Sequence, residues 1–253
     1  MSLVLTPFRV LDTKAGKGAP KAAVRSGGTV DVKVTGTGGI PATGVSAVVL
    51  NVTATDPKSA GFVTAYASGL ARPPLSNLAF AAHQTVSNLV IVPVGANGKV
   101  TLYNSGPGTV QLVADVSGYY VAGQVTAAGG FAVLTPFRVL DTKAGKGAPK
   151  AAVRSGGTVD VKVTGTGGIP ATGVSAVVLN VTATDPKSAG FITAYASGLA
   201  RPPLSNLNFG AHQTVSRLVI APVGPNGKVT LYNSGPGTVQ LVADVSGYYV
   251  AKN

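Results

Sequence analysis

Hydrophobic and polar residues alternate along many short stretches of the chain. In TVDVKVT, residues 29–35, valine occupies every second position and polar residues fill the others. This is the period of a strand with one buried and one solvated face. Such stretches, separated by turn residues, predict about eight strands in the first half of the chain: Phe8–Thr13, Thr29–Thr35, Ser46–Thr55, Phe62–Tyr66, Asn77–Phe80, Thr85–Val94, Lys99–Asn104 and Thr109–Val121. No stretch has the 3.6-residue period of a helix, so we expect essentially no helix.

The second half of the chain repeats the first. Residues 4–122 align with residues 133–251 without a gap, and such internal repetition marks a repeated structural unit. We therefore expect two modules, residues 1–122 and 133–253, joined by a Gly/Ala-rich linker at 123–132. About six aligned positions differ: Val63/Ile192, Ala79/Asn208, Ala81/Gly210, Asn88/Arg217, Val92/Ala221 and Ala96/Pro225.

So many short strands in a module of this size predict an all-β fold, in which two antiparallel sheets pack as a sandwich. A closed barrel is the alternative. Asn97-Gly98 is a strong hairpin signal, and Ser105-Gly106-Pro107-Gly108 marks a further turn. We therefore expect the last three strands of each module to form an antiparallel meander.

Two predicted strands are apolar on both faces. AVVLNV, residues 47–52, and NLVIVPV, residues 88–94, lack the polar half of the alternation, although no helix is expected to cover a second face. Either a neighbouring sheet or another module must cover them. Self-association of the chain is therefore expected.

The charge of the chain favours acidic partners. The net charge is +12, the acidic residues are all Asp, and cysteine is absent. A basic protein is attracted to phosphate polymers, anionic glycans and nucleic acids without specificity, and a chain without cysteine has no disulfide and no thiolate site. No apolar run has the roughly 20 residues of a membrane helix. MSLVLTPFR lacks a signal-peptide pattern, so either the protein is cytosolic or its targeting segment is absent from this chain.

Catalysis has few candidate groups. Each copy holds four Asp residues and one His, His83 or His212. A triad of Ser87, His83 and Asp115 lacks the motifs that orient a nucleophile, so we expect no enzyme and no cofactor. The carboxylates lack the dense spacing of an EF-hand loop. A single Ca²⁺ at Asp12 or Asp56 is an alternative, but we expect Asp12 to pair with Arg9 or to cap a turn at Thr13.

Sugar recognition has better candidates. It needs aromatic rings beside planar hydrogen-bonding groups, and these occur near SNLAF and the following AAHQT. The candidate ligand-binding residues are Asn77, His83, Gln84, Tyr103 and Asn104, with Asn206, His212, Gln213, Tyr232 and Asn233 in the second copy. The alternative is that the amides satisfy loop backbone groups of the protein itself.

One basic segment is a candidate contact for polyanions. KAGKGAPKAAVR, residues 14–25, carries four basic residues, and it is either a polyanion contact or a solvated basic loop. Single-strand binders of nucleic acid interleave basic residues with an aromatic platform. Here Trp is absent and most Tyr and Phe residues lie apart from Lys and Arg, so nucleic acid is not the expected partner.

The motifs TPFRVLDT, GVSAVVLNVTAT, SNLNF, QTVSRLVIAPVG and VADVSGYY resemble a β-rich module of large secreted and cell-surface proteins of actinobacteria. The pattern of that module is P-x-R-[VL]-L-D-T-R. Lys14 and Lys143 stand where the pattern has Arg, which removes a bidentate side chain there. The resemblance implies a noncatalytic accessory unit outside the cell.

These observations favour an extracellular or cell-surface module that binds polysaccharide or cell-wall glycan, lectin-like, through two copies acting bivalently. One alternative is a structural repeat that self-associates into an oligomer, fibre or surface layer. The other is a basic nucleic-acid binder.

Overall fold

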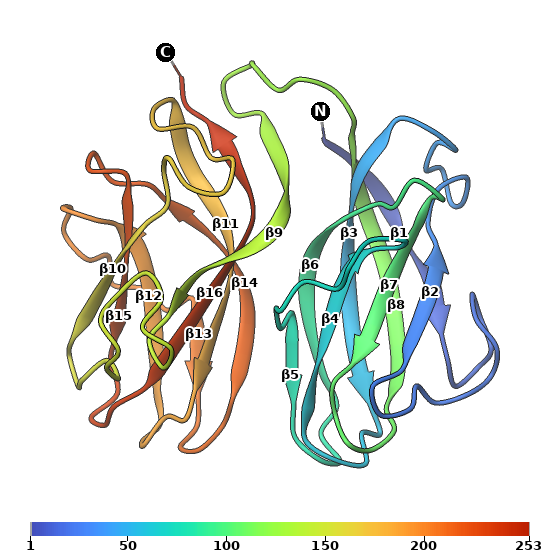
Figure 1. The fold of residues 1–253 in the computed structure, drawn as a ribbon, viewed down its shortest axis with the longest axis horizontal. Coiled ribbons are helices and arrows are strands. Elements are labelled where there is room, and N and C mark those ends of the chain that lie inside the picture. The colour runs from blue at the N-terminus through green and yellow to red at the C-terminus, as the bar shows by residue number, and fades with distance from the viewer. Residues whose placement is uncertain (1, 253) are drawn as a thin grey trace. The chain divides into compact units, whose positions relative to one another are not determined.

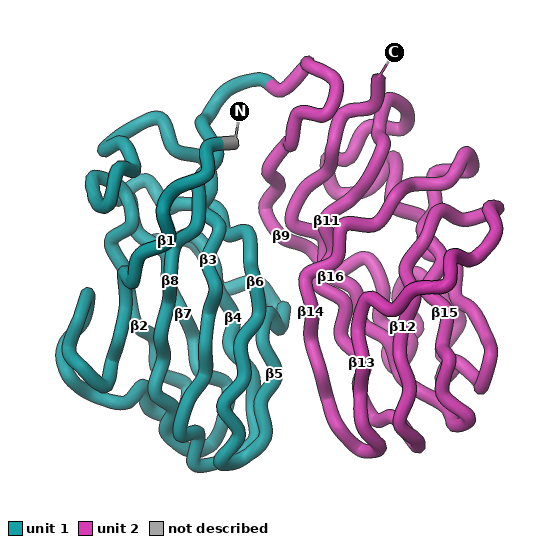
Figure 2. The backbone as a smooth tube through the Cα atoms, turned by 180° about the vertical axis from the view of Figure 1, so that it is seen from behind, with its two compact units in different colours: residues 1–124 teal, residues 125–253 magenta. Residues whose placement is uncertain are grey.

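The computed structural model describes residues 2–252, and every regular element in them is a strand. The chain divides into two compact units, Met1–Gln124 and Val125–Asn253 (Figure 2). The strands of the first unit are β1 (Ser2–Asp12), β2 (Thr29–Lys33), β3 (Val45–Thr55), β4 (Gly61–Ala67), β5 (Leu78–Phe80), β6 (Val86–Pro93), β7 (Lys99–Asn104) and β8 (Gln111–Val121). Those of the second are β9 (Phe131–Asp141), β10 (Thr158–Lys162), β11 (Val174–Thr184), β12 (Gly190–Ala196), β13 (Leu207–Phe209), β14 (Val215–Pro222), β15 (Lys228–Asn233) and β16 (Gln240–Val250).

Each unit is a sandwich of two antiparallel four-stranded sheets (Figure 1). The long-strand sheet of the first unit has the order β1-β8-β3-β6, and the short-strand sheet has the order β2-β7-β4-β5. The second unit repeats both orders with β9 to β16. This arrangement is that of a jelly roll, in which the two sheets are joined by crossing connections. The predicted all-β sandwich is confirmed, and the closed-barrel alternative is wrong.

The core lies between the two sheets. On β3, alternate residues Leu50, Val52 and Ala54 point inward and are at most 1% exposed. Val100 and Leu102 of β7 face them from the other sheet. In residues 29–35 the valines likewise pack in or against the core while Asp31 and Lys33 are exposed. The period-two pattern therefore predicted correctly which side chains of this strand face inward.

The predicted meander of the last three strands is wrong. β6 pairs with β3, β7 pairs with β2 and β4, and β8 pairs with β1 and β3. The Asn97-Gly98 turn is present, with Gly98 at φ 73°, but it leads from one sheet into the other. β6 ends at Pro93, and Val94 beyond it still donates a 3.0 Å backbone hydrogen bond to the Ser46 carbonyl. A local turn signal gives the reversal of the chain, but it does not say which sheet the next strand joins.

The strand boundaries agree closely with prediction except at the linker and at the first strand, which was predicted to begin at Phe8 and begins at Ser2. β7 has the predicted bounds. β9, however, begins at Phe131, and Gly129 and Val250 share a backbone hydrogen bond of 2.9 Å. The end of the predicted linker at 123–132 therefore belongs to the second unit. Val133 was too late a start because the alignment of the copies did not show that Phe131 and Ala132 extend the strand.

The long-strand sheet has one face that its own module leaves uncovered. The short-strand sheet covers the inner face, whereas Val49, Leu89 and Ile91 alternate outward from the core residues of β3 and β6. Leu89 is 40% exposed. The sequence predicted this two-sided apolar character, and within the described part of the first unit no other strand lies on that outer face. No helix that could span a membrane occurs among residues 2–252.

Candidate functional site

The amide of Asn77 is engaged inside the module. Its Oδ1 accepts a 2.7 Å hydrogen bond from the Ala65 N–H, and its carbonyl oxygen accepts one of 2.7 Å from the side chain of Asn88. Asn77 is 6% exposed. In the second module Asn206 likewise accepts from the N–H of Ala194. Asn77 therefore joins the segment before β5 to β4, and Asn206 joins the segment before β13 to β12. These amides bond the protein's own backbone, which was the alternative to a ligand-binding role.

Asn104 is also a structural residue. It is fully buried, and its Nδ2 donates to the carbonyl oxygens of Val24, Arg25 and Gly108 at 3.2, 3.1 and 2.9 Å. Its Oδ1 accepts a 2.9 Å bond from the Gly106 N–H. Asn233 makes the four equivalent bonds in the second module. Because both amide atoms are bonded to the protein's own backbone and both residues are fully buried, placing Asn104 and Asn233 in a ligand site was wrong.

His83 and Gln84 lie in the turn after β5. His83 is exposed and has φ 60°, a left-handed conformation that non-glycine residues rarely adopt. Its N–H donates to the carbonyl of Pro57 at 2.8 Å. Gln84 Oε1 accepts a 3.0 Å bond from the Ala81 N–H, and His212 and Gln213 repeat this turn. The two side chains therefore mark a shaped turn beside the β3–β4 loop, apart from the predicted partner Tyr103.

Tyr103 lies on the outer face of the short-strand sheet, where Arg72 covers its ring. The guanidinium carbon of Arg72 is 4.1 Å from the ring centroid, and Arg201 lies 4.2 Å from the ring of Tyr232 in the second module. Such stacking is a cation–π contact. The group presented to solvent is therefore the exposed arginine, and the face of the ring that it covers is not open to a sugar.

A carboxylate network lies beside this stack. Asp31 of β2 accepts a 2.6 Å bond from the Thr101 hydroxyl and a 3.1 Å bond from the Ser68 hydroxyl. Ser68 in turn accepts a 3.1 Å bond from Asn97. The register pairs Thr101 with both Asp31 and Tyr66, so a carboxylate, a hydroxyl and an aromatic residue form a row across the outer face.

The second module repeats this network with the same distances. Thr230 donates to Asp160 at 2.6 Å, Ser197 donates to it at 3.1 Å, and Asn226 donates to Ser197 at 3.1 Å. We call this area the outer-face site, made of Asp31, Tyr66, Arg72, Thr101 and Tyr103 and their equivalents Asp160, Tyr195, Arg201, Thr230 and Tyr232. Its polar groups are held in place before any ligand arrives, which lowers the entropy cost of binding.

The PFRVLDT motif forms a structural ion cluster. Arg9 donates to Asp115 at 2.9 and 3.4 Å and to Asp12 at 3.1 Å. Asp12 Oδ1 also accepts the N–H groups of Lys14 and Ala15, so the expected ion pair and turn cap are confirmed. The hydrogen bond from the Ala15 N–H is the main cause that holds the pKa of Asp12 below its usual value. The hydrogen bond to Asp115 raises the pKa of Arg9.

The remaining carboxylate, Asp56, pairs with Lys58 at 2.7 Å on an exposed loop, and this bond lowers the pKa of Asp56. Across residues 2–252, no group of three or more His, Asp or Glu side chains is placed to hold a metal ion. Each carboxylate of the first module therefore has a partner: an arginine, a lysine or hydroxyl groups.

The sequence analysis missed Arg72, Asp31, Ser68 and Thr101. Arg72 lies in the segment between β4 and β5, and that segment crosses the outer face because the Thr64 hydroxyl donates to the Leu75 carbonyl at 2.6 Å. Nothing in the local pattern predicts that crossing. Asp31 and Thr101 had a signal, since both occupy the solvated positions of period-two strands.

No family model and no curated protein matches the chain. Solved structures do match, and two of them have low TM-scores. The crystal structure of the STIV MCP has a TM-score of 0.33 and 8% identity, covering 98% of this chain and 96% of that chain. The CBM22-1-CBM22-2 tandem domain of Paenibacillus barcinonensis Xyn10C has a TM-score of 0.27 and 11% identity, covering 98% of this chain and 99% of that chain. Similarity at this level says nothing about what this chain binds.

Proposed function

We propose that each module binds polysaccharide at its outer-face site and that the chain acts as a noncatalytic, bivalent binding protein outside the cell. The observation that carries this proposal is the stack of Arg72 on Tyr103 beside the hydroxyl-bound carboxylate of Asp31, which recurs in the second module.

The chemistry of the site suits sugar hydroxyls. An ionised carboxylate accepts hydrogen bonds, and Asp31 already has its two oxygens oriented by Thr101 and Ser68. Tyr66 lies one strand beyond Thr101 and supplies an aromatic ring for the C–H face of a sugar. Arg72 adds a planar donor that matches a carboxylate or phosphate substituent.

Several observations support a noncatalytic role. The carboxylates that a hydrolase would use as acid and base are bound to Arg9, to Lys58 or to hydroxyl groups. The single histidine of the first module lies in an exposed turn. The resemblance to actinobacterial surface modules points the same way, and it is also the basis for placing the protein outside the cell.

Two binding sites on one chain would raise its apparent affinity for a polymer. Once one module holds a polymer, the second binds at a high effective concentration, so that the tandem binds more tightly than either site alone. Asp31 and Asp160 are equivalent positions. Inactivating either site alone is therefore expected to remove the avidity, and inactivating both is expected to remove binding.

The test is retention of the full chain on insoluble polysaccharides and on actinobacterial cell walls across a salt series. Asp31→Asn with Asp160→Asn keeps the side-chain shape and removes the carboxylates. The matched control is Asp56→Asn with Asp185→Asn, which removes the same charge from exposed loops. We expect at least about a tenfold loss with the first pair, since a hydrogen bond to a charged group contributes about 1.5–3 kcal/mol. Equal retention of both pairs, or no retention of the unaltered chain, would contradict the proposal.

The uncovered face of the long-strand sheet favours a second candidate, self-association into an oligomer or surface layer. Ile220 is 54% exposed in the second module, and exposed apolar faces mark interaction surfaces. Leu89→Lys with Leu218→Lys adds charge to this face at positions that are not fully buried. If the face assembles, sedimentation will show a smaller species than for the unaltered chain. A monomeric unaltered chain would exclude this candidate.

A further inference from the structure

Each module has a pocket that lies apart from the outer-face site. It is enclosed by the segment after β1 and by the start of β2, on the side of the sandwich where the edge strands of both sheets meet. In the first module the cavity has a volume of about 280 Å³, and in the second the equivalent cavity has about 340 Å³. These volumes lie near the lower end of ligand pockets, about 300–1,000 Å³, and suit a compact ligand.

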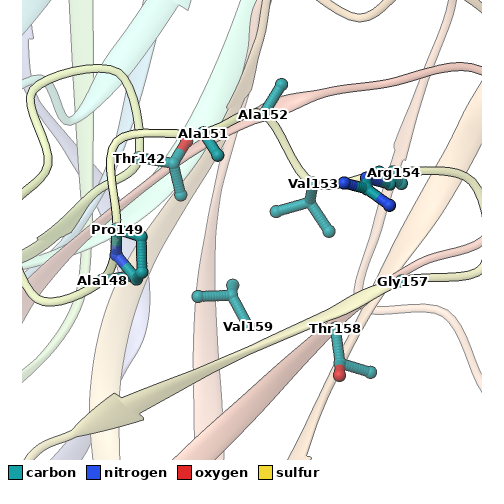
Figure 3. A pocket seen from close by; sticks show the side chains of 10 residues that line it. All are labelled: Thr142, Ala148, Pro149, Ala151, Ala152, Val153, Arg154, Gly157, Thr158 and Val159. Carbon is teal, nitrogen blue, oxygen red and sulfur yellow. The ribbon is translucent and has the colours of Figure 1, made fainter.

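The wall is apolar and one end is cationic. The residues that line the pocket of the second module are Thr142, Ala148, Pro149, Ala151, Ala152, Val153, Arg154, Gly157, Thr158 and Val159. In Figure 3 the side chains of Val153 and Val159 project into the space between the two segments, and Arg154 lies at one end of it. Arg25 takes the same place in the first module.

The segment that forms the wall is anchored at both ends. Asp12 and Lys17 exchange two backbone hydrogen bonds of 2.9 and 3.0 Å, and Val24 and Val110 exchange two of 2.8 and 3.0 Å. The buried side chain of Asn104 then holds the carbonyls of Val24 and Arg25. The pocket is therefore preformed, and a ligand need not order the segment to bind.

The basic residues around the pocket form no close ion pair in the described part of the chain; beside the bond from Lys58, Lys14 contributes only at longer range to the lowered pKa of Asp56. Lys14, Lys17, Lys21 and Arg25 all lie on this segment, and none has an ion pair within residues 2–252. The carboxylates that could have paired with them are occupied by Arg9, by Lys58 and by hydroxyl groups. Arg25 lines the pocket, and the three lysines lie on the same segment; such a concentration of one sign of charge attracts ligands of the opposite sign.

We infer that this pocket binds an acidic sugar residue, with the sugar carboxylate on the guanidinium of Arg25 or Arg154 and the C–H face of the ring against the alanine and valine wall. The inference rests on the proposed polysaccharide function and adds to it a second site in each module with a defined ligand class. The planar fork of arginine matches a carboxylate in two parallel hydrogen bonds. The apolar wall provides for the rest of the ring.

The test uses the full chain and two forms of one polymer, polygalacturonate and fully methyl-esterified polygalacturonate, at a fixed ionic strength. Esterification removes the charge and leaves the sugar backbone in place. Arg25→Gln with Arg154→Gln removes the cation at the pocket. Ala22→Leu with Ala151→Leu fills the pocket without changing charge. The control pair, Lys58→Gln with Lys187→Gln, removes the same charge from the exposed β3–β4 and β11–β12 loops.

We expect the unaltered chain to bind polygalacturonate and to lose at least about tenfold in affinity with either pocket pair, as for loss of a charge-assisted contact, while the control pair changes little. The methyl signals of Ala19, Ala22 and Ala23 should shift when galacturonate is added. Equal losses for the Arg25 pair and the control pair would overturn the inference, because the attraction would then be nonspecific. Absence of binding to polygalacturonate would overturn it as well.

The Asp31 and Asp160 variants and the pocket variants together distinguish failure of this inference from failure of the proposed function. Retention on neutral polysaccharide that depends on Asp31 and Asp160, together with polygalacturonate binding that does not depend on Arg25 and Arg154, supports the outer-face site and overturns the acidic-sugar pocket. Loss with the pocket pairs, together with retention in Asp31→Asn and Asp160→Asn, supports the pocket and contradicts the outer-face site.

Discussion

Asn104→Ala distinguishes a structural amide from a ligand-binding one. The fully buried Asn104 side chain bonds four backbone groups, at 2.9 to 3.2 Å. Two of these bonds, to the Val24 carbonyl and from the Gly106 N–H, are buried. The Val24 carbonyl keeps its hydrogen bond from the Val110 N–H, so one buried group, the Gly106 N–H, is left unpaired, and the first module is expected to lose about 2 kcal/mol of unfolding free energy. Water can satisfy the two bonds that are only partly buried.

The assay is urea unfolding of the full chain followed by far-ultraviolet circular dichroism. With a slope of about 1.5 kcal/mol per molar urea, a loss of about 2 kcal/mol moves the midpoint by about 1.3 M. Only the altered module should move, so the curve should separate into two steps of similar amplitude, with the second module as internal reference. Asn233→Ala should give the mirror result.

Two outcomes would refute this reasoning. A midpoint shift below about 0.7 M, equivalent to about 1 kcal/mol at this slope, would mean that the four bonds do not hold the turn together. Loss of polysaccharide retention at 4 °C with an unchanged midpoint would mean that Asn104 touches ligand, as the sequence had suggested.

Three further predictions concern the scaffold. The hydrogen bond from the Ala15 N–H is the main cause of the lowered pKa of Asp12. The ionised Asp12 therefore stabilises the fold above the unfolded pKa of about 3.9, and this stability is lost as pH falls through the folded pKa. Asp12→Asn should make the thermal midpoint fall less steeply below about pH 4. Gly18→Ala places a methyl group against the Val10 carbonyl, whereas Gly27→Ala meets no atom within 4 Å at a similar positive φ, so denaturation should show the larger loss for Gly18→Ala. The core of the second module contains Ile192 and Ala221 where the first has Val63 and Val92. Ala221→Val restores the valine while the larger Ile192 remains, so calorimetry should show a loss of about 1–3 kcal/mol of unfolding free energy from overpacking.

Much of the fold could be predicted from local patterns. Alternation in residues 29–35 gave the inward valines of β2 because the side-chain period of a strand is a local property. The order of strands could not be predicted in this way. β7 and β8 are joined by a short turn but lie in different sheets. β7 pairs with β2 and β4, which are distant from it in the chain, and a local pattern does not show such pairings.

Only part of the candidate site could be predicted, because its contacts also depend on segments distant in the chain. Polar residues such as Asn77 and Asn104 were correctly singled out as unusual, but a sequence does not show whether an amide bonds a ligand or its own backbone. Both amides bond the backbone. Tyr103 was found, whereas its partner Arg72 was not, because the contact depends on a segment that crosses the sheet face.

The strand order has a consequence for how the chain reaches its native state. Almost every ladder joins segments far apart in sequence, such as β1 with β8, and proteins rich in such distant pairings fold slowly. The two modules also contain identical partners: β3 and β11 both read VSAVVLNVTAT, and β8 and β16 both read QLVADVSGYYV. During slow folding, β8 therefore meets two equivalent partners on one polypeptide. Strand exchange between modules is thus the characteristic misfolding hazard of this tandem, and it is set by the same near-identity that gives the chain two equal sites.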